Sequence, residues 1–131
     1  MSFEQLLRPK SVAVVGASAT PGKVGYEILH NLINDQFEGE IYPINPVANE
    51  ILGKKCFKKL NEIPGKIDLA IFVIKRDLVI PLLHECVEKG IKAVIVITAG
   101  FGETGEEGRK LQQEMVNIAR DNDIALVGPN C

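Results

Sequence analysis

A glycine-rich segment, residues 16–25 (GASATPGKVG), carries the residue types and spacing best suited to chemistry in this chain. An apolar run precedes it and an amphipathic pattern follows it, so we expect the free amides of a first helical turn to point at a ligand above the loop. Gly16 allows a sharp turn, Gly22 allows the backbone to approach a ligand closely, and Gly25 allows tight packing of helix on strand. The natural occupant is an anion, and the segment predicts a site for the phosphates of an adenine nucleotide.

The side chains of the segment support this prediction. Ser18 and Thr20 add hydroxyl donors, and Lys23 adds a positive charge. No acidic residue occurs in the segment, so we expect its positive field to be unopposed. The predicted phosphate-binding residues are Gly16, Ala17, Ser18, Thr20, Pro21, Gly22, Lys23, Val24 and Gly25.

The spacing differs from two familiar nucleotide-binding patterns, G-x-G-x-x-G and G-x-x-x-x-G-K-[ST]. Val24 follows Gly22 and Lys23 and has no hydroxyl for magnesium, which disfavours a nucleotide-hydrolysing P-loop. An NAD site would place Asp or Glu about twenty residues further on, at the end of the second strand, to hold the ribose. The chain has Asn45 there. A turn without any ligand remains the structural alternative.

The elements around the segment alternate between short apolar runs and amphipathic stretches. We expect strands at residues 11–15, 40–44, 67–74, 92–97 and 124–127, and helices from residue 24 onward, at 78–89 and at 106–121. Such alternation is typical of repeated βαβ units, so we predict one α/β domain over residues 1–131, with a doubly wound, Rossmann-like parallel sheet. Ligands bind such sheets at the carboxyl ends of the strands.

Other loops that follow the strands reach the same edge of the predicted sheet. Two segments flank the glycine-rich loop: Asn45 with Pro46, and residues 74–77. We expect them to be able to contact an adenosine and its phosphates. Lys75 and Arg76 either contact phosphate or are simply solvated. A second glycine-rich segment, residues 99–105, is flexible enough to close over a ligand.

Composition excludes several other functions. The net charge is −2 and no basic cluster alternates with aromatic residues, which disfavours nucleic acid as a partner. The apolar runs are far shorter than the roughly 20 residues needed to cross a bilayer, so we expect no membrane association and a cytoplasmic protein. Cys56, Cys86 and Cys131 are odd in number and widely spaced, as expected of reduced thiols. His30 and His84 lack partners at metal-ligand spacing, so we expect structural roles for both and no metal site.

Several short segments together resemble one known family. They are residues 11–18 (SVAVVGAS), 21–25 (PGKVG), 42–46 (YPINP), 63–64 (IP), 68–70 (DLA), 97–101 (ITAGF) and 128–131 (GPNC). The combination resembles the CoA-binding domain of NDP-forming acyl-CoA synthetases, the family of ADP-forming acetyl-CoA synthetase and the succinyl-CoA synthetase α-subunit. The resemblance spans nearly the whole chain.

The resemblance implies that coenzyme A is the ligand. It assigns contacts with CoA to the glycine-rich loop and to Asn45, Pro46, Val73, Ile74 and Lys75, with Ala99, Gly100 and Phe101 nearer the reacting end. One departure is the Ile-Lys-Arg sequence at 74–76, where many relatives have a proline and small residues.

In that family an acid, CoA and a nucleoside triphosphate are converted reversibly to acyl-CoA, a nucleoside diphosphate and phosphate, through an acyl phosphate and a phosphohistidine. The phosphohistidine belongs to a domain after this one. The resemblance therefore implies no catalytic residue in this chain, and we expect it to be the N-terminal part of a longer synthetase with further domains or a partner subunit. Two alternatives stay open: a free-standing regulatory module for CoA or adenine nucleotides, and an NAD(P)-binding oxidoreductase domain.

Overall fold

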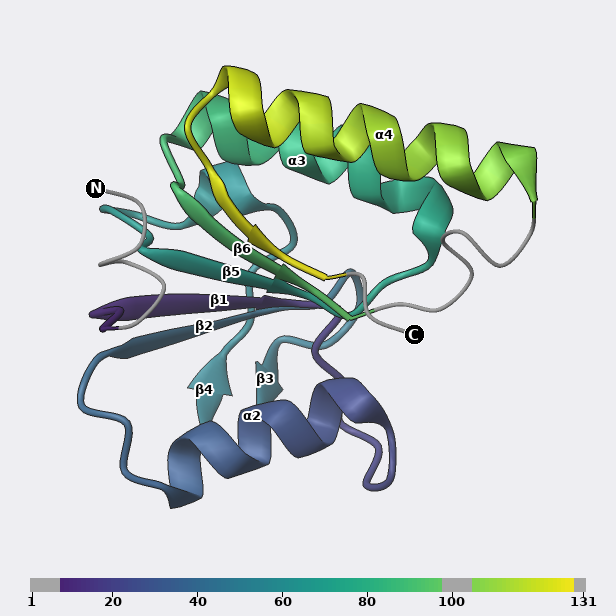
Figure 1. The fold of residues 1–131 in the computed structure, drawn as a ribbon. Coiled ribbons are helices and arrows are strands. Elements are labelled where there is room, and N and C mark those ends of the chain that lie inside the picture. The colour runs from purple at the N-terminus through teal and green to yellow at the C-terminus, as the bar shows by residue number, and fades with distance from the viewer. Residues whose placement is uncertain (1–7, 98–104, 129–131) are drawn as a thin grey trace.

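A parallel sheet of five strands, in the order β2-β1-β5-β6-β7, forms the centre of the molecule (Figure 1). The structure is a computed structural model, and it describes residues 8–97 and 105–128. The strands are β1 (Ser11–Val15), β2 (Glu40–Ile44), β5 (Leu69–Phe72), β6 (Ala93–Val96) and β7 (Ala125–Val127). Every neighbouring pair in this sheet is parallel.

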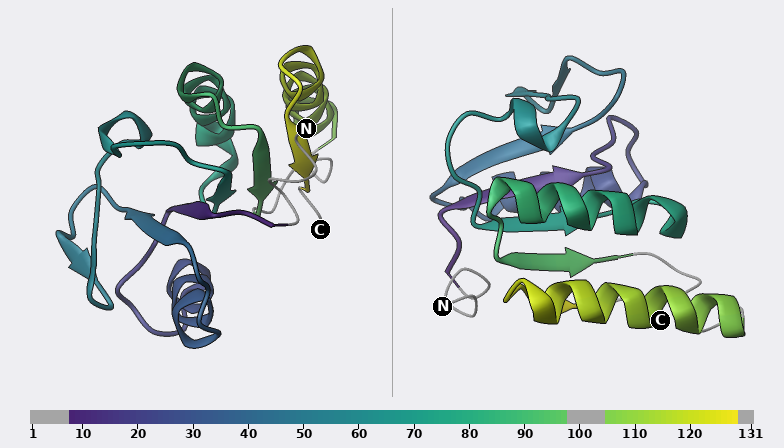
Figure 2. Two further views of the ribbon diagram at one scale, coloured as in Figure 1. Left: turned by 90° about the vertical axis from the view of Figure 1, so that its left-hand side faces the viewer. Right: turned by 90° about the horizontal axis from the view of Figure 1, so that it is seen from above.

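Helices lie on both faces of the sheet. The helix α2 (Val24–Asn34) covers one face, while α3 (Val79–Lys89) and α4 (Glu106–Asp121) lie side by side on the other (Figures 1 and 2). A short 3-10 helix, η2 (Arg76–Leu78), leads into α3. The predicted doubly wound α/β fold is confirmed.

The strands form where uninterrupted apolar runs predict them, because strands covered on both faces bury every side chain. All five residues of β1 are buried. Three predicted strands were too long: β5 is two residues shorter at each end, β6 is one residue shorter at each end, and β7 begins one residue later. Pro43 lies in β2, an edge strand of the sheet. Proline has no amide hydrogen, and at an edge strand its absence does not cost a hydrogen bond with the neighbouring strand β1.

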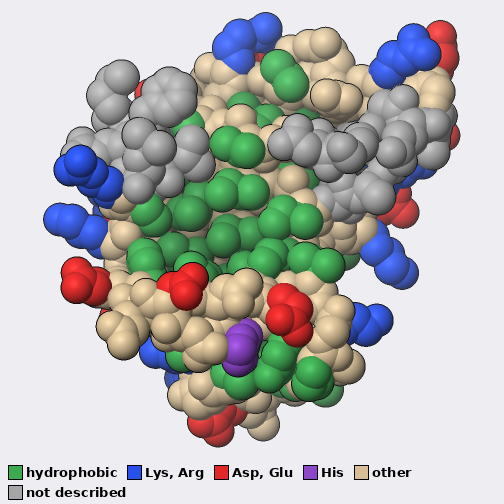
Figure 3. Space-filling model, turned by 60° about the horizontal axis from the view of Figure 1, so that its bottom comes forward, with side chains coloured by type: hydrophobic (Ala, Val, Ile, Leu, Met, Phe, Trp, Pro, Cys, Tyr) green, Lys and Arg blue, Asp and Glu red, His purple; other side chains and the backbone are tan. Residues whose placement is uncertain are grey.

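The core has two parts, one on each side of the sheet. On the α3 and α4 side, Phe72, Leu83 and Met115 are fully buried. On the α2 side, Leu29 packs over β1. No described helix covers the α2-side face beyond β1, and Figure 3 shows hydrophobic side chains gathered across the sheet beside α2.

A small antiparallel hairpin between β2 and β5 was not predicted. It consists of β3 (Glu50–Ile51) and β4 (Lys54–Lys55), and a 3-10 helix, η1 (Leu60–Glu62), follows. Leu52 and Gly53 make the turn with φ of 52° and 80°, the positive values that two-residue hairpin loops require. The hairpin leads the chain back toward the carboxyl end of β2.

Candidate functional site

The carboxyl ends of β1 and β5 form a topological switch point. From β1 the chain passes through α2 to β2 on one side, and it later returns to β5 on the other side of β1. Loops that leave such neighbouring strands diverge and open a crevice, which is where open parallel sheets bind ligands. The segments after β1, β2 and β5 all reach this edge.

Gly16 and Gly25 permit the close packing that forms the crevice. Gly16 has φ +93°, and a side chain at Gly16 would overlap the backbone carbonyl of Val73, in the segment after β5. A side chain at Gly25 would overlap the carbonyl oxygen of Gly16. The first turn of α2 therefore lies directly against the end of β1, as the glycine spacing predicts.

Gly22 differs from these two glycines because it faces open space. It has φ +93°, and no atom lies within 4 Å of the position that its Cβ would take. The loop around it is ordered by the Oγ of Ser18, which accepts a hydrogen bond from the Thr20 amide at 3.0 Å. A ligand can thus approach the face of Gly22 to which a Cβ would point.

The expectation of an unopposed positive field at this loop is wrong. The Gly22 amide donates a hydrogen bond of 3.1 Å to Oε2 of Glu27, which lies in the first turn of α2. An acidic side chain is favoured there because it faces the positive end of the helix dipole. A carboxylate therefore occupies a donor that a phosphate would use. The loop sequence alone did not reveal it, although the rule that acidic residues favour first helical turns could have.

The side chain of Asn45 connects the loop after β2 with the loop after β1 by hydrogen bonds. Its Nδ2 donates to the carbonyl oxygen of Ala17 at 2.8 Å, and its Oδ1 accepts from the amides of Val47 and Ala48, each at 2.8 Å. The side-chain oxygen of Asn45 is thus already hydrogen-bonded to the backbone. Pro46, which follows, is exposed at the rim of the crevice.

The segment after β5 brings two apolar residues and one cation to the same edge. Val73 and Ile74 are half-buried, whereas Lys75 is exposed. Arg76 pairs with Glu107 of α4 at 3.7 Å. The expected contact of Lys75 or Arg76 with phosphate stays a prediction.

A cavity of about 200 Å³ joins the three segments. Gly16, Pro46 and Ile74 contribute to its wall, one from each segment, and Lys58 lies on its lining as well. Its remaining lining consists of Val15, Ile44, Lys59, Leu60, Leu78, Leu82 and Glu85. The cavity is mainly apolar with cations and one carboxylate, a combination suited to a flat base next to phosphates. The sequence analysis missed Lys58 and Lys59, which follow the unpredicted hairpin.

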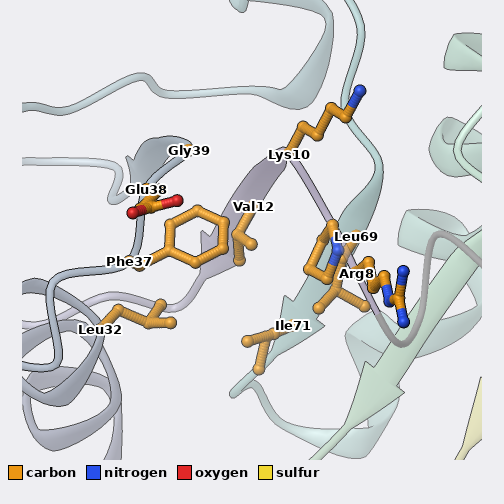
Figure 4. Close-up of a pocket in the computed structure, with 10 residues that line it drawn as sticks. Arg8, Lys10, Val12, Leu32, Phe37, Glu38, Gly39, Leu69 and Ile71 are labelled. Atoms are coloured by element: carbon orange, nitrogen blue, oxygen red, sulfur yellow. The ribbon is translucent and has the colours of Figure 1, made fainter.

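A wider cavity of about 750 Å³ lies elsewhere, at the amino ends of the strands (Figure 4). Lys10, Gly39 and Leu69 line it just before or at the start of their strands, and Phe37 lies across from Ile71. Open parallel sheets bind ligands at the opposite edge. We therefore assign no ligand to this cavity.

The remaining residues singled out in the sequence lie apart from the crevice or outside the described residues. Ala99, Gly100, Phe101 and Cys131 belong to the second group. His84 is exposed on α3. His30 stacks on Tyr26 within α2, with its ring 3.1 Å from Nδ2 of Asn34. Among the described residues no group of three His, Cys, Asp or Glu side chains is placed to hold a metal ion.

The two described cysteines are buried structural residues. Cys86 is fully buried in the core on the α3 side, and burial, with a smaller contribution from Glu85, raises the pKa of its thiol to about 12. Burial also raises the pKa of Cys56. A thiol with a raised pKa is a poor nucleophile, so neither cysteine is suited to catalysis. Within the described ranges no helix is long and apolar enough to cross a bilayer.

The fold defines a Rossmann-like α/β domain with a crevice at the carboxyl ends of its central strands. Comparison with known proteins identifies the particular class. The chain belongs to the CoA binding domain family, whose model matches residues 10–131.

Three relatives illustrate the relationship. The α subunit of acetate–CoA ligase (ADP-forming) I from Pyrococcus furiosus is 48% identical over 99% of this chain and 29% of its own length. The 4-hydroxybutyrate–CoA ligase (ADP-forming) from Nitrosopumilus maritimus is 47% identical over 100% of this chain and 19% of its own. The solved structure of dinucleotide-forming acetyl-coenzyme A synthetase 1 from Ca. Korarchaeum cryptofilum, with phosphate and ADP, is 40% identical and superimposes with a TM-score of 0.92 over 99% of this chain and 28% of that one.

The chain therefore spans less than a third of each of these relatives. The relatives are thus longer proteins, and one of them is named as an α subunit.

Proposed function

We propose that this chain binds coenzyme A in the crevice at the carboxyl ends of β1, β2 and β5. The observation that carries the proposal is the loop at Gly22, where a backbone open to solvent meets the N-terminus of α2 at the switch point. Helix N-termini and glycine-rich turns bind phosphate groups. CoA is favoured over other phosphorylated ligands by membership of the CoA-binding family.

The parts of CoA are assigned by the chemistry of each segment. The diphosphate lies on residues 16–25, where Ser18, Thr20 and Lys23 supply donors in addition to the backbone amides. The adenosine lies in the cavity of about 200 Å³ beside Pro46 and Ile74. Val73 and Lys75 flank it, and Ala99, Gly100 and Phe101 belong toward the thiol end of the ligand.

We further propose that the chain acts as the CoA-binding domain of an NDP-forming acyl-CoA synthetase. Such an enzyme joins an acid to CoA at the expense of a nucleoside triphosphate, reversibly. The supporting observation is identity of 47–48% to ADP-forming CoA ligases over almost the whole chain. The chain's own residues bind and orient CoA, and the phosphoryl chemistry belongs to further domains or a partner subunit. No residue of this chain is assigned a catalytic role.

Calorimetric titration of the 131-residue chain with CoA, ADP and NAD at one salt concentration tests the ligand. We expect CoA to bind more tightly than ADP, and NAD to bind weakest. Equal affinity for CoA and ADP would favour a sensor of adenine nucleotides. Absence of CoA binding would contradict the proposal for the isolated chain.

Gly22→Val tests the assignment of the loop, and Gly65→Val is its matched control. Both glycines have positive φ, +93° and +86°, and both have open space at the Cβ position, but Gly65 precedes β5 at the opposite edge of the sheet. Strain at positive φ should destabilise both variants by a similar amount, about 1–2 kcal/mol. Only Gly22→Val should weaken CoA binding, by at least roughly tenfold, because its side chain projects to where the diphosphate lies. Unchanged affinity in a folded Gly22→Val variant would remove the loop from the site.

A further inference from the structure

Lys58 reaches the ligand edge of the sheet through backbone pairing with β2. Phe57 forms a parallel bridge with Ile44, its amide donates to the carbonyl oxygen of Pro43 at 2.9 Å, and its own carbonyl accepts from the amide of Asn45 at 3.0 Å. The next residue, Lys58, therefore leaves the pairing at the same edge as Asn45. Its backbone amide donates to Oε1 of Glu62 at 3.1 Å, which fixes the chain as it turns into η1.

The side chain of Lys58 is held at the rim of the crevice. Its Nζ donates a hydrogen bond of 3.2 Å to the carbonyl oxygen of Pro46 and lines the cavity that Gly16 and Ile74 also line. A lysine ammonium has three donors, so two remain for a ligand. Glu62 and Glu85 are the nearby carboxylates, and in the described part of the chain neither forms an ion pair with Lys58.

We propose that Lys58 contacts the 3′-phosphate of CoA and is the residue by which the site distinguishes CoA from ADP and NAD; this rests on the proposed binding of CoA. With the diphosphate at Gly22 and the base in the cavity, the ribose that connects them must lie over the turn at Pro46. A phosphate on that ribose then meets the ammonium that Pro46 holds. ADP and NAD have only a hydroxyl at this position and gain nothing from the charge.

Asn45 has no side-chain group free to distinguish CoA from ADP or NAD. Its Oδ1 is engaged by two backbone amides and its Nδ2 by the carbonyl oxygen of Ala17. NAD sites typically have an Asp or Glu at this position, whose carboxylate accepts a hydrogen bond from a ribose hydroxyl. This site has Asn45 instead, and its side-chain oxygen is already hydrogen-bonded to the backbone. The ammonium of Lys58, in the neighbouring segment, therefore makes the site prefer a ribose with a 3′-phosphate over one with a 3′-hydroxyl.

The test compares CoA with dephospho-CoA, which lacks only the 3′-phosphate, by calorimetry at low salt. The variants are Lys58→Gln and, as a matched control, Lys66→Gln, which removes one exposed lysine charge at the amino end of β5. We expect the unmodified chain to prefer CoA by about tenfold, as for one charge-assisted contact. Lys58→Gln should lower CoA affinity by roughly five- to tenfold and leave dephospho-CoA within about twofold. Lys66→Gln should preserve the preference.

Each other outcome overturns the proposal in a recognisable way. Equal affinity of the unmodified chain for both ligands would mean that the 3′-phosphate is not recognised, although CoA binding itself would stand. Equal loss of both ligands in Lys58→Gln would place its effect on the diphosphate or on the loops. An equal effect of Lys66→Gln would indicate the general field of the surface. Failure of the unmodified chain to bind either ligand would contradict the proposed function as well.

Discussion

Replacing Glu27 by Gln should strengthen binding of CoA. The Glu27 carboxylate accepts a hydrogen bond from the Gly22 amide at 3.1 Å, the donor that we assign to the diphosphate. A phosphate oxygen bonded to the same amide would lie about 2.9 Å from its nitrogen. Two anions would then share one donor, with their charges about 5 Å apart. Glutamine keeps an oxygen that can accept from Gly22 and removes only the charge.

Coulomb's law gives the size of the expected effect. Two unit charges about 5 Å apart interact by about 0.8 kcal/mol in a medium with the dielectric constant of water. A diphosphate brings two charges near the carboxylate, so the total repulsion is about 1.5 kcal/mol. Glu27→Gln should therefore raise CoA affinity by roughly four- to tenfold at low salt. The gain should shrink in about 0.15 M salt, where the Debye length is about 8 Å.

The assay is calorimetric titration with CoA at two salt concentrations, with Glu38→Gln as the control. Glu38 is exposed and lies before β2 at the opposite edge of the sheet, so its removal makes the same change in net charge away from the loop. Identical low-salt affinities of Glu27→Gln and the unmodified chain would refute the placement of a phosphate at Gly22. Weaker binding by the variant would mean that the carboxylate is needed to hold the loop in shape.

Two further predictions concern the packing around the site and in the core. Gly25→Ala should destabilise the fold by about 1–3 kcal/mol in urea unfolding, because its methyl group overlaps the carbonyl oxygen of Gly16; a change under about 0.5 kcal/mol would contradict the packing. The Cys86 thiol ionises near its ordinary pKa of 9.0 when unfolded and near 12 when folded, so stability should fall as the pH rises from 9 toward 12, by up to about 1.4 kcal/mol per pH unit. Cys86→Ala should abolish this decline, and persistence of the decline in that variant would assign it to other groups.

The sheet and its helices were predictable because their signals are local. A strand covered on both faces is a continuous apolar run, so β1 was predicted with its observed limits, and the strand-like composition of residues 40–44 predicted the limits of β2. The helix α4 also has its predicted limits because its apolar residues recur with a helical period. The hairpin escaped prediction because β3 and β4 contain two residues each, too few to show any period.

The site was predictable only in part, for a physical reason that differs between residues. The glycines after β1 indicate, from the sequence alone, a sharp turn and a close approach of the backbone to a ligand. Glu27 and Lys58 act through contacts that the folded chain creates: one with an amide five residues earlier, the other with a carbonyl twelve residues earlier across a bridge between segments. Sequence spacing reports which residues a segment contains but does not report which of them folding brings to a given donor.

The contacts among the loops determine how the site should bind. Gly16 packs on Val73, and both Gly16 and Ala17 donate to the carbonyl oxygen of Ile44 at 3.2 Å. Asn45 adds a bond of 2.8 Å back to Ala17. Contacts within the protein thus hold the three segments together, and a site whose loops are held in this way loses little conformational entropy on binding. The diphosphate contacts that we propose are available to CoA, ADP and NAD alike, so selectivity for CoA must come from groups outside the glycine-rich loop.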